Sequence, residues 1–202
     1  MSRFIWLLLV LWLGSADAAA PKIMVLGDSL SAAYGIPVAQ GWVSLLAQRL
    51  RDRGYPHEVI NASVSGETTS GGLARLQQAL DAHHPALVLV ELGANDGLRG
   101  LPVKAMQQNL ERIVAVVRKA HATPVLFEML VPTNYGDAYV ERFTGTFTTV
   151  ASKSKVPLVP FFLSPIATDP AAFQEDGIHP RAVVQGKLLD AVWPTLEPLL
   201  KK

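Results

Sequence analysis

Residues 86–92 read Ala-Leu-Val-Leu-Val-Glu-Leu, and six of these seven side chains are apolar. A strand with one face in water alternates apolar and polar residues, whereas a strand covered on both faces is apolar almost throughout. The run therefore predicts a strand that is buried on both faces, as in a parallel sheet. Parallel strands are joined by crossover connections, usually helices, so strand and helix patterns should alternate on either side of this run.

Four other short apolar runs have the character of strands. They lie at residues 22–26, 58–60, 124–128 and 156–159. Apolar residues at helical spacing predict helices over about 42–50, 72–82, 106–117, 138–152 and 182–200. Five strands separated by helices indicate a three-layer α/β/α sandwich around a five-stranded parallel sheet. Right-handed crossovers favour the flavodoxin-like strand order 2-1-3-4-5 over a six-stranded dinucleotide-binding fold.

The N-terminus has the composition of a secretory signal peptide. Arg3 precedes nine consecutive apolar residues at 5–13, and Ala16-Asp17-Ala18 has the small-x-small pattern of a cleavage site. Nine residues are too few to span a bilayer, which takes ~20. We therefore expect residues 1–18 to be removed near Ala18 and residues 19–202 to form a single domain. The mature protein should be secreted, into the periplasm where the source has two membranes.

Charge and cysteine content exclude several classes of protein. The formal net charge is +1, which gives no electrostatic argument for binding nucleic acid or an anionic membrane surface. The chain has no cysteine, so it forms no disulfide and carries no lipid on an N-terminal cysteine. We expect a monomer that has no nucleic-acid partner and does not insert stably into a membrane once the signal peptide is removed.

Polar residues follow the first three predicted strands, where folds of this type bind ligands. Gly27-Asp28-Ser29-Leu30 follows the first strand, residues 61–72 the second and residues 93–97 the third. Strand 1 should lie between strands 2 and 3, so the three loops should converge. Ser29 supplies a hydroxyl at a sharp turn. The backbone N–H groups of Ser29 and Gly66, with the side-chain amide of Asn95, are candidates for an oxyanion hole.

A serine nucleophile needs a base, and residues 176–180 supply one. Asp176 precedes His179 by three residues across a glycine turn, so its carboxylate can hold the imidazole in one tautomer. These residues follow the fifth strand, which should lie three strand spacings from the first strand, or roughly 14 Å at ~4.8 Å per spacing. The segment 160–176 can reach about 50 Å, which is far enough. The pattern predicts a Ser29–His179–Asp176 triad, and no H-E-x-x-H or phosphate-loop motif indicates a metal or a cofactor.

Four blocks of the sequence together resemble the GDSL, or SGNH, hydrolase family, and closely its bacterial thioesterase I/lysophospholipase/arylesterase branch. The blocks are residues 27–30, 61–72, 93–96 and 176–180. They occur in the family's order and extend over essentially the whole of residues 19–202. The resemblance implies that Ser29 is the nucleophile, that Gly66 and Asn95 are oxyanion donors, and that Asp176 and His179 complete the triad.

The same resemblance implies a serine esterase or thioesterase that forms an acyl-enzyme, takes a small acyl ester or thioester and needs no cofactor. A carbohydrate O-acetylesterase of the same family is an alternative, and it would not gain activity as the acyl chain lengthens. A flavodoxin-like binding module without chemistry is a second alternative. It would not hydrolyse p-nitrophenyl butyrate.

The segment 96–102 directly follows Asn95 and carries Leu98 and Leu101 among glycines. We interpret it as a loop that is anchored at its start beside Asn95 and whose middle can move to contact the acyl chain, although the two leucines would also suit a cover over the core. Residues 131–136, which include Tyr135, offer a second wall. Asp28 is interpreted as structural. The remaining histidines are expected at the surface, at positions 57, 83, 84 and 121.

Overall fold

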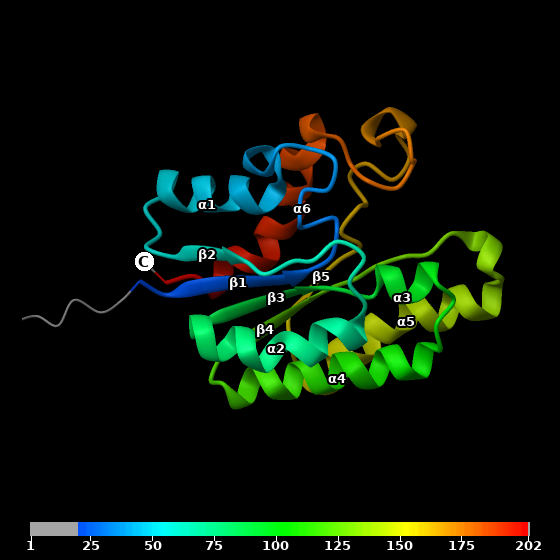
Figure 1. Cartoon of the computed structure of the whole chain (residues 1–202), viewed down its shortest axis with the longest axis horizontal. Helices are drawn as coiled ribbons and strands as arrows, with labels where there is room; N and C mark the ends of the chain where they lie inside the picture. Colours follow the sequence, from blue (N-terminus) through cyan, green and yellow to red (C-terminus); the bar gives the residue numbers. More distant parts are fainter. Residues whose placement is uncertain (1–19, 202) are drawn as a thin grey trace, which may run out of the picture.

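This computed structural model describes residues 20–201. A five-stranded parallel sheet forms the middle layer of this part of the protein (Figure 1). Its strands are β1 (Lys22–Gly27), β2 (Glu58–Asn61), β3 (Leu87–Glu91), β4 (Thr123–Phe127) and β5 (Leu158–Val159). The order across the sheet is β2-β1-β3-β4-β5, and each neighbouring pair is parallel. This order confirms the predicted fold class. The expected signal peptide lies outside the described residues.

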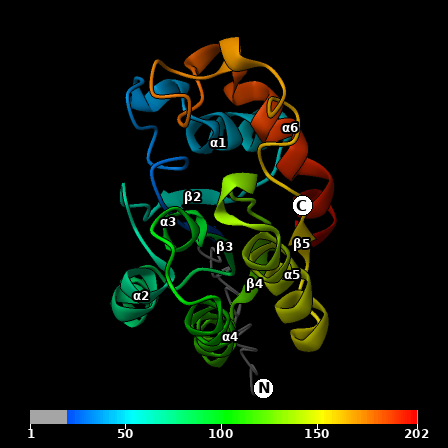
Figure 2. The same cartoon turned by 90° about the vertical axis from the view of Figure 1, so that its right-hand side faces the viewer.

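Helices cover both faces of the sheet. They are α1 (Trp42–Asp52), α2 (Thr69–His83), α3 (Ala94–Leu98), α4 (Val103–Lys119), α5 (Asp137–Ser154) and α6 (Gln185–Leu196). Short 3-10 helices lie at Val38–Gln40, Thr133–Tyr135, Pro170–Ala172, Ala182–Val184 and Glu197–Leu199. Helices α1 and α6 pack on one face, and α2, α4 and α5 pack on the other (Figures 1 and 2).

The core is built on both sides of β3, the central strand. All five residues of β3 are buried, as the apolar run predicts. Helix α4 faces the sheet with a row of buried side chains at helical spacing, namely Met106, Leu110, Ile113, Val114 and Val117. Burying one such side chain stabilises the fold by roughly 1.5–3 kcal/mol. Packing of this kind replaces the disulfides that the chain cannot form.

Two helices begin where the sequence predicts loops. Helix α2 starts at Thr69 rather than at Gly72, because the Thr68 hydroxyl caps it by accepting a hydrogen bond from the Gly71 N–H (3.2 Å). Residues 94–98 form α3, so the segment 96–102, which is predicted as a loop with an anchored start, begins as a helix. The Asp96 carboxylate is buried and accepts hydrogen bonds from the hydroxyl (2.6 Å) and the N–H (2.8 Å) of Thr69.

The C-terminal segment and one histidine also differ from expectation. The single helix predicted over 182–200 is α6 with a short 3-10 helix at either end. Helix α6 continues through Pro194, whereas Pro198, which lacks the N–H that a continuous helix needs, lies in the 3-10 helix that follows it. His57 is buried, with 8% of its surface exposed, so the prediction of a surface residue is wrong in this case. Its burial lowers the pKa of His57 below the usual value.

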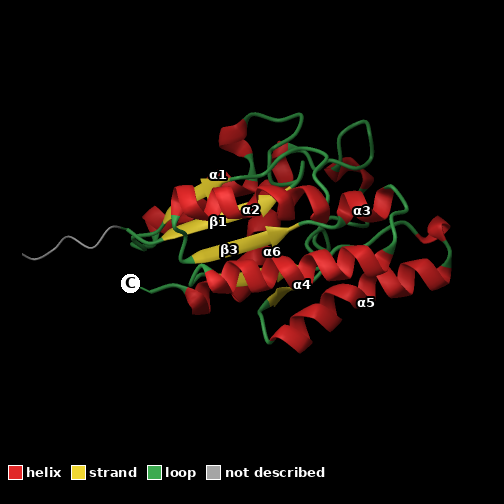
Figure 3. Cartoon of the chain, turned by 60° about the horizontal axis from the view of Figure 1, so that its bottom comes forward, coloured by secondary structure: helices red, strands yellow, loops and turns green. Residues whose placement is uncertain are grey.

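The carboxyl ends of the strands all lie at one edge of the sheet, where Figure 3 shows α3 beyond the tip of β3. Hydrogen bonds tie the loops together at this edge. The Val64 N–H donates to the Gly27 carbonyl (3.0 Å), and the Arg99 guanidinium donates to the Gly66 carbonyl (2.8 Å). The loops that follow β1, β2 and β3 therefore converge, as the strand order requires.

The packing of α3 predicts an unusual effect of adding a methyl group to Gly97. A Cβ there would overlap Val131 and lie 2.7 Å from Cε2 of Phe143. Gly97→Ala should therefore lower the free energy of unfolding by about 1–3 kcal/mol, although alanine favours helix.

Gly145→Ala in α5 is the matched control, because a Cβ at position 145 meets no atom of the described residues within 4 Å. This variant should be as stable as the wild type or more stable in urea unfolding. Equal stability of the two alanine variants would contradict the packing described for α3.

Candidate active site

Ser29 lies at the tip of the turn that follows β1. The Asp28 carboxylate shapes this turn by accepting a hydrogen bond from the Leu30 N–H (3.0 Å), and the Asp28 carbonyl accepts one from the Ala32 N–H (2.9 Å). The Ser29 hydroxyl oxygen is 2.9 Å from Nε2 of His179, a residue 150 positions later in the chain. The turn thus presents the hydroxyl to an imidazole from the C-terminal part of the fold.

Asp176 fixes the other side of the imidazole. Its Oδ2 is 2.7 Å from Nδ1 of His179, and its Oδ1 accepts hydrogen bonds from the backbone N–H groups of Ile178 and His179 (both 2.9 Å). The hydrogen bonds from the backbone and the ring of His179, then the one from Ile178, lower the pKa of Asp176 to about 2. Because a carboxylate can only accept, Nδ1 carries a proton and Nε2 of the neutral ring is free to accept the Ser29 proton.

A pair of buried carboxyl groups lies beneath the Ser29 turn. Glu91, the last residue of β3, accepts hydrogen bonds at Oε2 from the Ser31 hydroxyl (2.6 Å) and the Asp28 N–H (3.2 Å). Glu91 and Asp28 are both fully buried. Burial raises the pKa of Asp28 to about 6, and burial together with the Asp28 charge raises the pKa of Glu91 well above its usual value. A Cβ at position 27 would lie 2.7 Å from Oε2 of Glu91, so this packing requires Gly27.

The other two candidate oxyanion donors lie on the neighbouring loops. The Asn95 side chain, at the start of α3, donates from Nδ2 to Oδ2 of Asp28 (2.9 Å). Gly66 has a φ of +78°, a conformation that favours glycine, and its carbonyl is held by Arg99. The same buried Asp28 therefore shapes the Ser29 turn and orients the Asn95 amide.

A cavity of about 470 Å³ opens beside Ser29 and His179. Its walls are mainly apolar and include Leu98, Leu130, Val131, Phe161, Leu163 and Ile178. The structure thus brings Leu98 and the start of segment 131–136 to the cavity. Sequence reasoning missed Phe161 and Leu163, although both follow β5 and parallel strands end at one edge of the sheet. Tyr135 is not a wall residue; its hydroxyl donates to the Leu98 carbonyl (2.8 Å).

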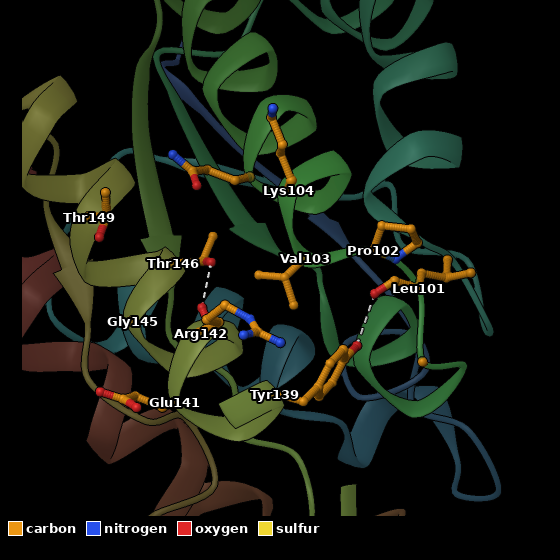
Figure 4. Close-up of a pocket in the computed structure, with 12 residues that line it drawn as sticks. Leu101, Pro102, Val103, Lys104, Tyr139, Glu141, Arg142, Gly145, Thr146 and Thr149 are labelled. Atoms are coloured by element: carbon orange, nitrogen blue, oxygen red, sulfur yellow. Dashed lines mark hydrogen bonds between the residues drawn. The ribbon is translucent and has the colours of Figure 1, made fainter. Parts of the chain in front are cut away.

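A second, larger cavity of about 810 Å³ lies between α4 and α5 (Figure 4). Leu101 lines this cavity and not the one beside Ser29. The Tyr139 hydroxyl donates to the Leu101 carbonyl (3.0 Å), and Thr146 bonds within its own helix to the Arg142 carbonyl (2.8 Å). No histidine lines this cavity. Of these two cavities, the smaller is the one that a histidine lines.

An imidazole can accept the Ser29 proton, and an apolar cavity opens beside it. Both lie at the carboxyl edge of an α/β sheet. This arrangement defines a serine hydrolase. Comparison with known proteins agrees with this class. Residues 25–185 match the GDSL-like lipase/acylhydrolase family. The chain belongs to this family.

Individual relatives support the assignment over nearly the whole chain. Esterase TesA of Pseudomonas aeruginosa is 48% identical over 192 residues, which cover 95% of this chain and 96% of the relative. Thioesterase 1/protease 1/lysophospholipase L1 of Escherichia coli strain K12 is 41% identical over 183 residues, 91% and 86% of the two chains. The structure of the psychrotrophic esterase EstA from Pseudoalteromonas, inhibited by monoethylphosphonate, has a TM-score of 0.85 at 41% identity and covers 88% of this chain and 97% of that chain.

The buried carboxyl pair predicts an unusual dependence of stability on pH. The pKa of Asp28 is about 6 in the folded protein and 3.8 in its usual setting. Between about pH 4 and pH 6 the folded chain therefore binds more protons than the unfolded chain, so the contribution of this group to stability falls as the pH rises through that window.

Asp28→Asn removes the titrating group. The difference in free energy of unfolding, variant minus wild type, should increase as the pH rises from 4 to 6, by on the order of 1–3 kcal/mol. Urea unfolding of both proteins at several pH values measures the difference. A difference that does not change with pH would contradict a raised pKa of Asp28.

Proposed function

We propose that this serine esterase/thioesterase uses Ser29 as its nucleophile, His179 as its general base and Asp176 to orient the imidazole. The observation that carries the proposal is the continuous contact from hydroxyl to imidazole to carboxylate, at 2.9 Å and 2.7 Å. These distances suit proton transfer from a serine to an imidazole whose tautomer is fixed. Ser29 and His179 also both line the apolar cavity, so the reacting groups face the space that an acyl group would fill.

The reaction then proceeds in two halves. The Ser29 oxygen attacks the carbonyl carbon of the ester or thioester, its proton passes to Nε2 of His179, and the carbonyl π electrons move to oxygen. Collapse of this tetrahedral intermediate expels the alcohol or thiol, which takes the proton from Nε2, and leaves an acyl group on Ser29. Water, deprotonated by the same nitrogen, attacks the acyl-enzyme and releases the acid and the serine hydroxyl.

The negative oxygen of each tetrahedral intermediate needs hydrogen-bond donors. We assign this role to the N–H groups of Ser29 and Gly66 and to the Asn95 amide. The Asp28 contact with Asn95 supports the assignment, because it holds the Asn95 amide beside the Ser29 turn. The Arg99 contact with the Gly66 carbonyl keeps the Gly66 loop close to the end of α3. Losing one such donor typically costs ~10²–10³ in turnover.

Ser29→Ala should lower kcat for p-nitrophenyl butyrate by at least about a thousandfold, because the covalent route is lost. Ser152→Ala, at an exposed serine of α5, is the control and should retain wild-type turnover. Both variants should melt at the temperature of the wild type. If the purified Ser29 variant kept a tenth of the wild-type kcat, another group would be the nucleophile.

The apolar lining of the 470 Å³ cavity supports an acyl chain longer than acetyl as the preferred substrate. The names esterase and thioesterase 1/lysophospholipase L1, which the relatives carry, are consistent with acyl chains of this kind. We therefore favour acyl esters and thioesters over the acetyl groups of a carbohydrate. Each methylene that the cavity buries contributes about 0.8 kcal/mol to binding.

Leu98→Ala should reduce kcat/KM for octanoyl esters and leave it nearly unchanged for acetyl esters. Leu98 lines the cavity, and 37% of its surface is exposed. Leu101→Ala is a closely matched control, because Leu101 is also 37% exposed but faces the other cavity. An acyl-length series of p-nitrophenyl esters measures the effect. Equal losses for both chain lengths would mean that Leu98 only packs and that the acyl chain binds elsewhere.

We also propose that the protein is exported with residues 1–18 removed, and that residues 19–202 act as a monomeric single domain, in the periplasm where the source has one. The signal-like composition of the N-terminus supports export. Within residues 20–201, the structure has no helix that is long and apolar enough to cross a membrane. Intact mass and N-terminal sequencing of the exported protein test the proposal; a first residue of Met1 would refute cleavage.

A further inference from the structure

The ring of Tyr34 lies against the His179 imidazole, and the mechanism above gives it no role. The two ring centroids are 4.4 Å apart, and the planes are inclined by 37°. Tyr34 is nevertheless 52% exposed, so it does not belong to the core. A large side chain in this position covers one face of the imidazole and leaves both ring nitrogens to Asp176 and Ser29.

The backbone around Tyr34 is held in an uncommon conformation. Ala33 and Gly35, its two neighbours, both have positive φ, at +59° and +72°. A non-glycine residue such as Ala33 adopts this region at a cost, and such outliers gather at functional sites. The positive φ at position 35 favours glycine, and a Cβ there would also displace the Gln174 amide.

The same Gln174 ties the segment to the base. Its Nε2 donates to the Tyr34 carbonyl (2.9 Å), and its backbone N–H donates to the His179 carbonyl (2.8 Å). The Tyr34 N–H in turn donates to the Ser29 carbonyl (3.2 Å). The tyrosine is therefore connected through hydrogen bonds to the residue on each side of the proton transfer.

We propose that Tyr34 is a positioning residue for acyl transfer: its ring holds the imidazole in the plane that joins Asp176 to Ser29, and its π face stabilises the imidazolium that forms when His179 takes the serine proton. This inference rests on the proposed function. The face of an aromatic ring carries partial negative charge and attracts a cation placed over it. The neutral imidazole gains less from the contact than the imidazolium, so the ring favours the charged intermediate over the resting state.

Other charged groups also act on the imidazole and must be kept constant in a test. Asp176 faces Nδ1, and the buried Asp28 lies within electrostatic reach of the ring. Glu175 and Arg181 line the same surface hollow as Tyr34. Substitutions at Tyr34 alone leave all four charges in place, so they isolate the contribution of the aromatic ring.

The experiment compares Tyr34→Phe with Tyr34→Leu in kcat and in the pH dependence of kcat/KM for p-nitrophenyl butyrate. Phenylalanine keeps the ring, so this variant should match the wild type. Leucine keeps an apolar cover without a π face. It should lower kcat by about two- to fivefold, the effect of an exposed cation–π contact, with little change in KM. It should also move the acidic limb of the pH profile to lower pH, because the imidazole binds a proton less tightly.

The melting temperature separates this role from a structural one. Tyr34 is half exposed, so both variants should have the same melting temperature as the wild type. Equal kcat and pH profiles for the leucine and phenylalanine variants would overturn the proposal. So would an equal loss of rate at every pH accompanied by a lower melting temperature. Either result leaves the proposed function intact as long as Ser29→Ala is inactive, whereas an active Ser29→Ala would overturn the proposed function itself.

Discussion

The active edge of the fold depends on one buried carboxyl group, that of Glu91 at the end of the central strand. It lies beneath the turn after β1 and accepts hydrogen bonds from the Ser31 hydroxyl and the Asp28 N–H. Its position leaves no room for a side chain at Gly27. The Asp28 carboxyl above it then shapes the Ser29 turn and orients Asn95. The contacts thus run from the core through the buried pair to the groups that we assign to catalysis.

This arrangement explains why much of the fold and site can be predicted from the sequence. The apolar run that becomes β3 is buried on both faces, and this constraint fixes a parallel sheet and hence the edge at which its loops meet. The turn Asp28-Ser29 and the pair Asp176 and His179 are local patterns with recognisable chemistry. A long connection from β5 carries the last two across the sheet, and the chain length alone shows that it can.

Features set by tertiary packing could not be predicted in this way. Residues 94–98 contain Asn95 and Gly97, which favour turns, yet they form a helix because Asp96 is bound by Thr69 and Gly97 fits against Phe143. Leu98 and Leu101 are only three residues apart, but the structure directs them to different cavities. The contact of Tyr34 with His179 joins segments that are far apart in the sequence, and no local sequence pattern predicts it.

The proposed mechanism requires a covalent acyl-enzyme on the serine after β1. The most direct test treats the full-length mature protein with a p-nitrophenyl alkylphosphonate and maps the modified peptide by mass spectrometry, with denatured protein as the control. We predict one phosphonyl group per chain, attached to Ser29 with loss of p-nitrophenol, and complete loss of esterase activity at full labelling. Inactivation with the label on another residue, or full activity with Ser29 labelled, would contradict it.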